Sequence, residues 1–277
     1  MKVLAVLCIA GGLHAQWSDP ARGRKIAATV AAHGPPGSPV LIFFPGIGSG
    51  IEAYRRLLGS LSGYKVVFVQ PQHSLKEWNN AGRLPAAAQM DFERRELKEW
   101  VKDGVFVLGR MKARAAGVLG HGAGGLAAAA ACQVNPIFRA CLNLDGETMG
   151  SPFVLDQPFD QPFLWLRPLR ETAPSPTAAE LKDRQMTRGE YESIMAKSGS
   201  ASMWISRSVS TMVTLYAKDA DHKSFSNGRA GTRAFGLATT VIQEFFDEHM
   251  KSRRSLLFSG YATGYSEVVY QQFMTMK

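Results

Sequence analysis

The chain has 277 residues, of which 45% are hydrophobic and 20% are charged, a composition typical of a globular protein and not of a disordered one. Its formal net charge is +9, but the Lys and Arg residues are scattered among Asp and Glu and form no stripe with aromatic residues. We therefore expect no nucleic-acid partner and interpret the charge as general surface chemistry, with attraction to anionic surfaces as the alternative.

The first fifteen residues have the pattern of a secretory signal peptide. Lys2 is followed by the apolar run Val3 to Ala10 and then by a short segment that ends at Ala15. The run is far shorter than the roughly 20 residues of a membrane-spanning helix. We predict cleavage after Ala15, a single mature domain of residues 16–277, no stable membrane insertion and a secreted or periplasmic location. A buried N-terminal strand is the alternative.

Apolar, strand-like segments then alternate with helical segments along the chain. This order is typical of an α/β protein with a mostly parallel sheet and helices on both of its faces. An uninterrupted apolar run such as 40–44 suits a strand that is buried on both sides, and apolar residues recur at helical spacing in 91–111. The predicted strands are 25–32, 40–44, 64–69, 115–119, 138–144, 162–166 and 209–216, and the predicted helices are 91–111, 123–133 and 232–250.

The segment 170–207 interrupts this alternation. It is rich in charge and in proline near its start, and it contains short helical stretches at 178–185 and 189–197. An insertion between two strands is a candidate lid over an active site, and a solvated excursion without a role in substrate choice is the alternative. Beyond Lys251, aromatic residues recur, and we expect this tail to pack against the domain.

Loss of the signal peptide leaves two cysteines, Cys132 and Cys141. An exported protein with an even number of cysteines permits a disulfide. Two unbonded cysteines buried in the core are the interpretation that we favour from the sequence. Neither cysteine has a His or Cys neighbour at the spacing of a metal site, so we expect no metal.

The most informative segment is the run Val118 to Gly125, in which a predicted strand enters a Gly-rich turn and then an Ala-rich helix. This is the strand–turn–helix setting of the G-x-S-x-G nucleophile elbow, which raises a serine hydroxyl above the edge of a sheet. In this chain the serine position is Gly122, which has no side chain. The sequence thus predicts the frame of a serine hydrolase without its nucleophile.

The two partners that a serine nucleophile requires follow in suitable places. Asp145 comes directly after the predicted strand 138–144, and His222 follows the strand 209–216 through a short loop. The order of nucleophile position, acid and histidine is that of the α/β-hydrolase fold, whose functional groups gather at the carboxyl edge of the sheet. A turn residue and a surface histidine are the alternatives, and Asp219 and Asp221 are rival acids in the loop of His222.

Four segments resemble the secreted α/β-hydrolases related to platelet-activating-factor acetylhydrolase, a family of carboxylic ester hydrolases. The likeness spans about 40–250 without the insertion. It implies acid and base roles for Asp145 and His222, oxyanion binding by the backbone N–H groups of Ile47 and Ala123, no cofactor, and a small-molecule ester or lipid as partner. The matching segments are Val40 to Gly48 (with Pro45 where histidine is usual), Gly120 to Gly125, Asn143 to Gly146, and Asp221 to Phe225.

Loss of the nucleophile alone lowers kcat roughly 10⁶-fold in a serine protease. We therefore expect ester hydrolysis by the covalent route to be strongly impaired. Three replacements are conceivable: His121 beside the elbow, Ser49 in the Gly-rich loop, and a water molecule activated by His222. Two functional classes follow, a weakened ester hydrolase and a non-catalytic protein that holds a lipid or ester in the former acyl pocket.

Overall fold

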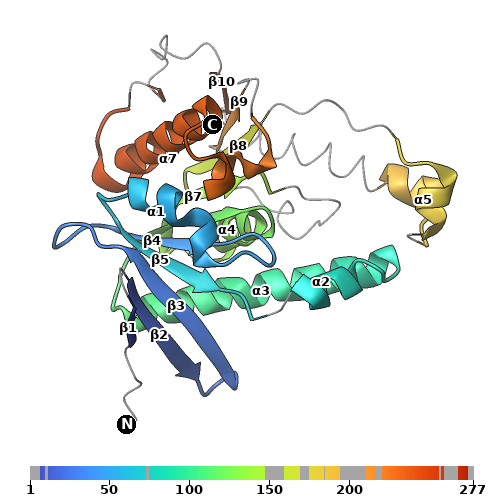
Figure 1. Ribbon diagram of the computed structural model, residues 1–277, viewed down its shortest axis with the longest axis horizontal. Helices are drawn as coiled ribbons and strands as arrows, with labels where there is room; N and C mark the ends of the chain where they lie inside the picture. The colour runs from blue at the N-terminus through green and yellow to red at the C-terminus, as the bar shows by residue number, and fades with distance from the viewer. Residues whose placement is uncertain are drawn as a thin grey trace.

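A single sheet organises the chain (Figure 1). The computed structural model describes residues 7–9, 12–72, 75–146, 159–168, 175–183, 185–193, 210–215, 220–255, 257–258 and 268–273. Within them ten strands lie in the order β1-β2-β3-β5-β4-β6-β7-β8-β9-β10. They are β1 Leu7–Ile9, β2 Gly12–Asp19, β3 Arg24–Ala32, β4 Val40–Phe44, β5 Lys65–Gln70, β6 Ala116–His121, β7 Phe138–Leu144, β8 Phe163–Pro168, β9 Ser210–Leu215 and β10 Val268–Phe273.

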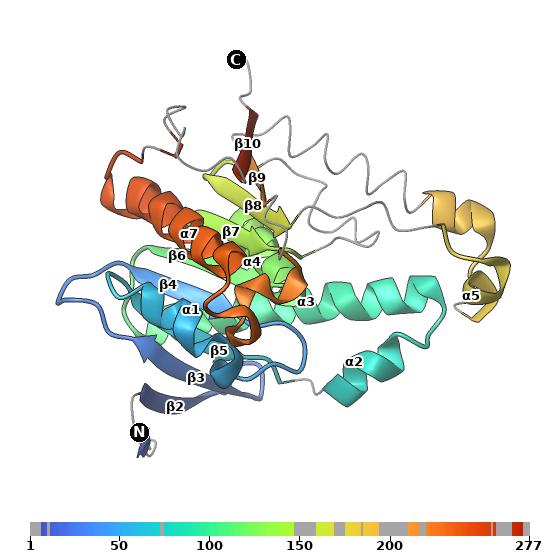
Figure 2. The ribbon, with the colours of Figure 1, turned by 45° about the horizontal axis from the view of Figure 1, so that its top comes forward.

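The strands from β5 through β4, β6, β7 and β8 to β9 run parallel, and antiparallel strands extend the sheet at both edges. Helices cover both faces of this sheet (Figures 1 and 2). The helices are α1 Arg55–Ser60, α2 Leu75–Ala81, α3 Ala86–Arg110, α4 Ala123–Val134, α5 Ala178–Asp183 and α7 Arg233–Lys251, with 3-10 turns η1 Ile51–Tyr54, η3 His222–Phe225 and η4 Asn227–Arg229.

Two hydrophobic cores lie on opposite faces of the sheet, because side chains alternate between the faces along each strand. In β4, Ile42 and Phe44 belong to the core that contains residues of α3 and α4. Leu41 and Phe43, the residues between them, belong to the core formed with α1 and α7. The apolar run that predicted a doubly buried strand therefore serves both cores.

Every predicted strand and helix is present, with most ends shifted by one or two residues. Helix α3 is the main difference, since it begins at Ala86 and not at Asp91. Alanine has the highest intrinsic helix propensity, so the residues at 86–88 extend the helix without taking part in the apolar pattern. The short helices α1 and α2 were not predicted, because their few apolar residues show no clear period.

The described part of the insertion 170–207 comprises 175–183 and 185–193. The first predicted helix is present as α5, and residues 189–193 of the second are helical, with the helix beginning one residue earlier, at 188. Helix α5 lies away from the sheet, on the same side as the outer ends of α2 and α3 (Figures 1 and 2). The rest of the insertion lies outside the described residues, and its action as a lid stays a prediction.

Contacts at the two ends of the chain complete the sheet. In the tail, β10 pairs antiparallel with β9, as expected of a tail that packs. Near the start, β2 pairs with β3, and Ala15 lies opposite Ala28, so cleavage after Ala15 would divide β2. Arg22 and Arg24, both beyond this point, form ion pairs with the buried Asp103 of α3. A chain that begins at Gln16 therefore keeps the ion pairs that attach the β2–β3 hairpin to α3.

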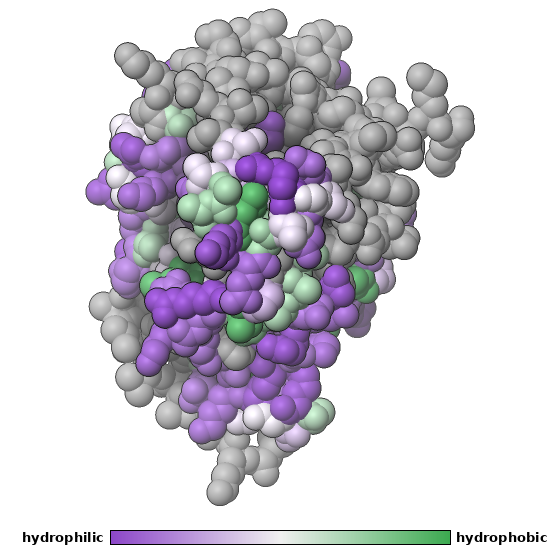
Figure 3. All heavy atoms as spheres, turned by 90° about the vertical axis from the view of Figure 1, so that its right-hand side faces the viewer, coloured by the Kyte–Doolittle hydropathy of each residue, from purple (hydrophilic) through white to green (hydrophobic). Residues whose placement is uncertain are grey.

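No helix among the described residues is both long and apolar enough to cross a membrane. Among the described residues on the face in Figure 3, hydrophilic ones predominate, and apolar residues appear in small patches. Scattered apolar residues of this kind are usual on a protein surface and mark no extended interface by themselves.

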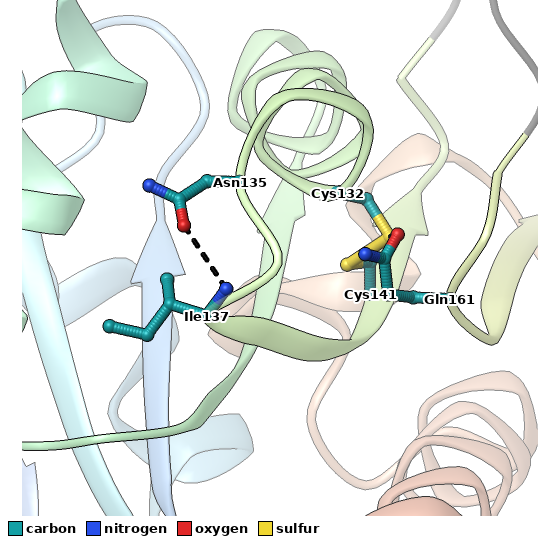
Figure 4. Close-up of a disulfide and its surroundings, with 5 residues drawn as sticks. All are labelled: Cys132, Asn135, Ile137, Cys141 and Gln161. Atoms are coloured by element: carbon teal, nitrogen blue, oxygen red, sulfur yellow. Dashed lines mark hydrogen bonds between the residues drawn. A yellow bond between two sulfur atoms is a disulfide. The ribbon is translucent and has the colours of Figure 1, made fainter.

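Cys132 of α4 and Cys141 of β7 form a disulfide, with their Cα atoms 5.9 Å apart (Figure 4). The preference for two unbonded cysteines was therefore wrong. The turn between the two elements, in which Asn135 Oδ1 accepts a hydrogen bond from the Ile137 N–H, folds β7 back beside the end of α4. This tight reversal brings together two cysteines whose spacing alone did not show that they would meet.

We predict that the double variant Cys132→Ser/Cys141→Ser unfolds more easily than the wild type. The bond closes a short loop, for which chain entropy gives about 2–3 kcal/mol of stabilisation. Urea denaturation measures this loss, and thiol titration of the unfolded, unreduced protein should find neither cysteine free. Two reactive thiols assigned to these positions by mass spectrometry would contradict the disulfide.

Candidate active site

The turn between β6 and α4 has the backbone of a nucleophile elbow. Gly122 has φ +56° and ψ −124°, a conformation that glycine adopts at little cost and other residues resist. A Cβ atom at Gly124 would collide with the carbonyl oxygens of Phe44 and Pro45. Glycine at this second position therefore allows the loop after β4 to pack directly against the elbow.

Asp145 follows β7 in a tight, braced turn. Its φ is +52°, and its N–H donates a 2.8 Å hydrogen bond to the carbonyl of Leu166. The Asn143 side chain holds the turn by bonding both backbone groups of Gly146 at 2.9 and 2.7 Å. The Gly122 N–H donates to the Leu144 carbonyl at 2.9 Å, so the elbow and the acid-bearing turn are joined.

His222 begins the 3-10 turn η3 and faces Asp145. Its Nδ1 lies 2.7 Å from Asp145 Oδ2, and the carboxylate is buried. The rival acid Asp221 forms an ion pair with Arg229 and caps η3 together with Ser224. Asp221 therefore braces the loop that carries the histidine, while Asp219 lies outside the described residues.

The third member of the arrangement is the space above Gly122. An ideal Cβ atom built on Gly122 lies 3.4 Å from Cε1 and 3.5 Å from Nε2 of His222. A seryl oxygen on this Cβ would come within hydrogen-bonding reach of Nε2. The fold thus brings Gly122, Asp145 and His222 together in the geometry that a Ser–His–Asp triad requires.

A buried chain of hydrogen bonds connects the loop after β4 to this histidine. The Gly46 N–H donates to the Tyr54 hydroxyl at 2.9 Å, and that hydroxyl lies 2.9 Å from His121 Nδ1. His121 Nε2 lies 2.9 Å from the His222 carbonyl, and the two imidazole rings stack with centroids 4.2 Å apart. With the Tyr54 hydroxyl as donor to Nδ1, His121 carries its proton on Nε2 and donates it to the carbonyl.

Burial explains the protonation states in this chain of bonds. Burial, together with the neighbouring His222 ring, lowers the pKa of His121 to about 4, so the ring is neutral near pH 7. Burial likewise raises the pKa of Tyr54, which keeps its hydroxyl proton. Both interactions of the His121 ring are thus satisfied by a neutral imidazole, and the ring acts as a support for His222, not as a nucleophile.

The predicted oxyanion donors lie beside the elbow. The turn after β4 is closed by a hydrogen bond from the Ser49 N–H to the Gly46 carbonyl. Ile47 of this turn and Ala123, the first residue of α4, line the same cavity. Within the described part of the chain, neither backbone N–H donates to a protein acceptor. The Ser49 hydroxyl bonds to Tyr54, which favours its interpretation as a loop-shaping residue over that of a nucleophile.

The cavity above the elbow has a volume of about 610 Å³, within the range of small-molecule sites. Trp78, Leu97 and Leu126 form apolar parts of its wall. Gln89 and Glu93 of α3 also line it, and the Gln89 amide donates to the Glu93 carboxylate at 2.8 Å. Burial raises the pKa of Glu93, while this hydrogen bond acts in the opposite direction.

Gln89, Glu93 and Tyr54 were not predicted from the sequence as site residues. In α3, Gln89 and Glu93 lie four residues apart, and the buried Leu97 follows four residues later. All three therefore lie on one face of the helix. This spacing was the available signal for the two polar residues. Tyr54 lies in the short turn η1, and nothing in its neighbourhood in the sequence pointed to the elbow.

Comparisons with known proteins bear on the fold. No family model and no curated protein matches the sequence. A solved ferulic acid esterase from Streptomyces cinnamoneus is similar over 94% of this chain and 95% of its own, with TM-score 0.67 and 17% identity. A dienelactone hydrolase from Anabaena variabilis is similar over 86% of this chain and 99% of its own, with TM-score 0.57 and 15% identity.

An acylaminoacyl peptidase from Pyrococcus horikoshii matches 88% of this chain and 42% of its own, with TM-score 0.54 and 13% identity. Each of these similarities extends over most of this chain. The chain has the α/β-hydrolase fold. At these identities the likeness establishes the fold alone, and the chemistry of this chain must be argued from its own residues.

We predict that His121 makes the fold sensitive to acid. Its pKa is about 4 in the folded protein, below the ordinary value of 6.5, so the unfolded state binds the proton first as pH falls. Stability is therefore lost between pH 6.5 and 4, by about 3 kcal/mol in total. Urea denaturation at pH 7 and 4.5 should show this loss, and it should be smaller by about 2 kcal/mol in His121→Gln. An equal loss in both proteins would contradict a buried, neutral His121.

Proposed function

We propose that this chain is a carboxylic ester hydrolase by descent, of the type related to platelet-activating-factor acetylhydrolase, and that the glycine at position 122 has removed its covalent route. The observation that carries the proposal is the 2.7 Å pair of Asp145 and His222, directed at the Cβ position of Gly122. In a working triad the carboxylate orients the imidazole, and the imidazole accepts the proton of the seryl hydroxyl. In this proposal Asp145 and His222 keep these two roles, and Gly122 supplies no hydroxyl.

Slow hydrolysis by direct attack of water follows from the same geometry. A water molecule beside Nε2 of His222 would lose its proton to the imidazole as it attacks an ester carbonyl, and the N–H groups of Ile47 and Ala123 would stabilise the oxyanion. General-base assistance contributes about 10²–10⁴-fold in rate. This is far less than an intact triad provides, so we propose a small-molecule ester as substrate and a low rate.

A second function, binding without turnover, is favoured by one observation. The cavity of about 610 Å³ is retained, with apolar walls and a few polar groups, although its nucleophile is missing. A cavity with such walls can bind a lipid or an ester whether or not it catalyses a reaction. Retention of the Asp145–His222 pair favours the weakened hydrolase, because binding alone requires neither residue in that orientation.

We predict that Gly122→Ser restores hydrolysis of a short p-nitrophenyl ester by at least 10³-fold, because it supplies the missing hydroxyl beside His222 Nε2. The backbone at this position is strained for serine by roughly 1–3 kcal/mol, so thermal unfolding should verify that the variant is folded. A fluorophosphonate probe should label the variant at position 122.

The matched control is the double variant Gly122→Ser/His222→Ala, which should lose the gained activity and the labelling. A folded single variant that remains inert would refute the assignment of the triad. If the wild type is labelled by the probe, the mapped residue would be a replacement nucleophile, and the proposal that the covalent route is lost would be wrong.

We propose further that the protein is exported and that residues 1–15 are removed. The disulfide between Cys132 and Cys141 supports this proposal, since such bonds persist in oxidising compartments. We predict that expression in a bacterium with its own leader yields a mature N-terminus at Gln16, by N-terminal sequencing or intact mass. Lys2→Asp, which removes the positive charge of the leader, should slow this processing. Recovery of the intact chain from the reducing cytoplasm alone would contradict export.

A further inference from the structure

Glycine at position 122 changes what the end of the cavity can bind. In a triad, the seryl oxygen stands between the elbow and Nε2 of the histidine. With Gly122, the ideal Cβ position is 3.5 Å from His222 Nε2, and both residues line the cavity. An oxygen atom of a ligand therefore has access to the edge of the imidazole that a seryl oxygen would otherwise occupy.

Backbone donors lie at the same end of the cavity. Ile47 and Ala123 line it, and within the described residues their N–H groups donate to no protein acceptor. Ala123 is the first residue of the twelve-residue helix α4, whose N-terminal end favours a negative charge. Ala123 follows Gly122 directly in the chain, and the Cα of Gly46, the residue before Ile47, lies 4.0 Å from the ideal Cβ position of Gly122.

We propose that this end of the cavity binds the carboxylate of a free organic acid. One carboxylate oxygen accepts hydrogen bonds from the N–H groups of Ile47 and Ala123, and the other lies against Nε2 of His222 in the place of the missing hydroxyl. Two equivalent acceptor oxygens suit these two sets of donors, and charge-assisted hydrogen bonds are stronger than neutral ones. Binding of the acid uses the site described above and does not depend on ester turnover.

A proton accompanies the ligand into the site. Nδ1 of His222 is engaged by Asp145 at 2.7 Å, so Nε2 must carry a second proton in order to donate to the carboxylate. Asp145 on one side and the ligand on the other then stabilise the imidazolium. The His222 ring also stacks on His121, which is neutral near pH 7. Lys223 is the next residue of η3 after His222. Bound in this way, the ring holds one proton for Asp145 and one for the ligand.

The wall of the cavity indicates the rest of the ligand. Lys223 of η3 lines it and adds positive charge, which favours an anionic head group. The apolar residues Trp78, Leu97 and Leu126 also line it and offer contacts to a hydrocarbon part. The ligand is thus an acid with an alkyl or aryl group.

Isothermal titration calorimetry with octanoate and octanamide tests the proposal, because the two ligands share a hydrocarbon chain and differ in the charge of the head group. Octanoate should bind at least tenfold more tightly than octanamide. Titrations at pH 7 in two buffers of different ionisation enthalpy should show a net proton uptake that His222→Gln abolishes. Equal affinities, no binding of octanoate, or no linked proton would each overturn the proposal.

Variants locate the carboxylate. Gly122→Ser should weaken octanoate binding at least tenfold while it remains folded, because its hydroxyl takes the place of one carboxylate oxygen. Ser226→Ala is the matched control: Ser226 lines the same cavity, and its hydroxyl donates to the Lys223 carbonyl, so the affinity should stay within twofold of the wild type. Unchanged binding by Gly122→Ser, or a tenfold loss in Ser226→Ala, would place the ligand elsewhere.

Failure of this inference and failure of the proposed function give different results. If Gly122→Ser gains esterase activity but the wild type does not bind octanoate, the hydrolase lineage of the site stands and the carboxylate site is refuted. If the wild type binds octanoate with proton uptake but folded Gly122→Ser is inert toward esters, the triad assignment is refuted and the carboxylate site stands.

Discussion

The hydrogen bond between His222 Nδ1 and Asp145 Oδ2 depends on where parallel strands end. Strand β7 ends at the acid, β6 ends at the elbow, and the two are neighbours in the sheet, so both functional positions open at one edge. The hydrogen bond from the Gly122 N–H to the Leu144 carbonyl fixes the position of the elbow relative to the turn that carries Asp145. The loop after β9 then has only to carry one histidine across this edge, and Asp221 with Arg229 gives that loop its shape.

The buried contacts of His121 extend this constraint to the loop that precedes η1. One neutral imidazole accepts from the Tyr54 hydroxyl and donates to the His222 carbonyl, while Tyr54 also binds the Gly46 N–H. The position of the histidine loop and that of the predicted oxyanion turn are therefore set by the same few bonds. His121 thus links the two sides of the site through hydrogen bonds to Tyr54 and to the His222 carbonyl.

Much of this arrangement was predictable from the sequence, because it is encoded by local patterns. Apolar runs marked the central strands, and the glycines around position 122, with a strand before them and alanines after them, marked the elbow. The order of Asp145 and His222 behind strands then placed both at one edge. Contacts between distant segments that no motif marks were not predictable, and Tyr54 is the clearest case, since its partners are 8 and 67 residues away. The edge strands β1, β2 and β10 and the disulfide were not predicted for the same reason, because each depends on which segments become neighbours in space.

The bond between Cys132 and Cys141 has a consequence for the order of assembly. The two cysteines are only nine positions apart in the sequence, so closing the loop costs little chain entropy and does not require the edge strands to be in place. In an oxidising compartment, the helix behind the elbow and the strand that leads to the acid can be locked together as an early unit. The sheet would then grow outward from the part of the chain that bears the chemistry.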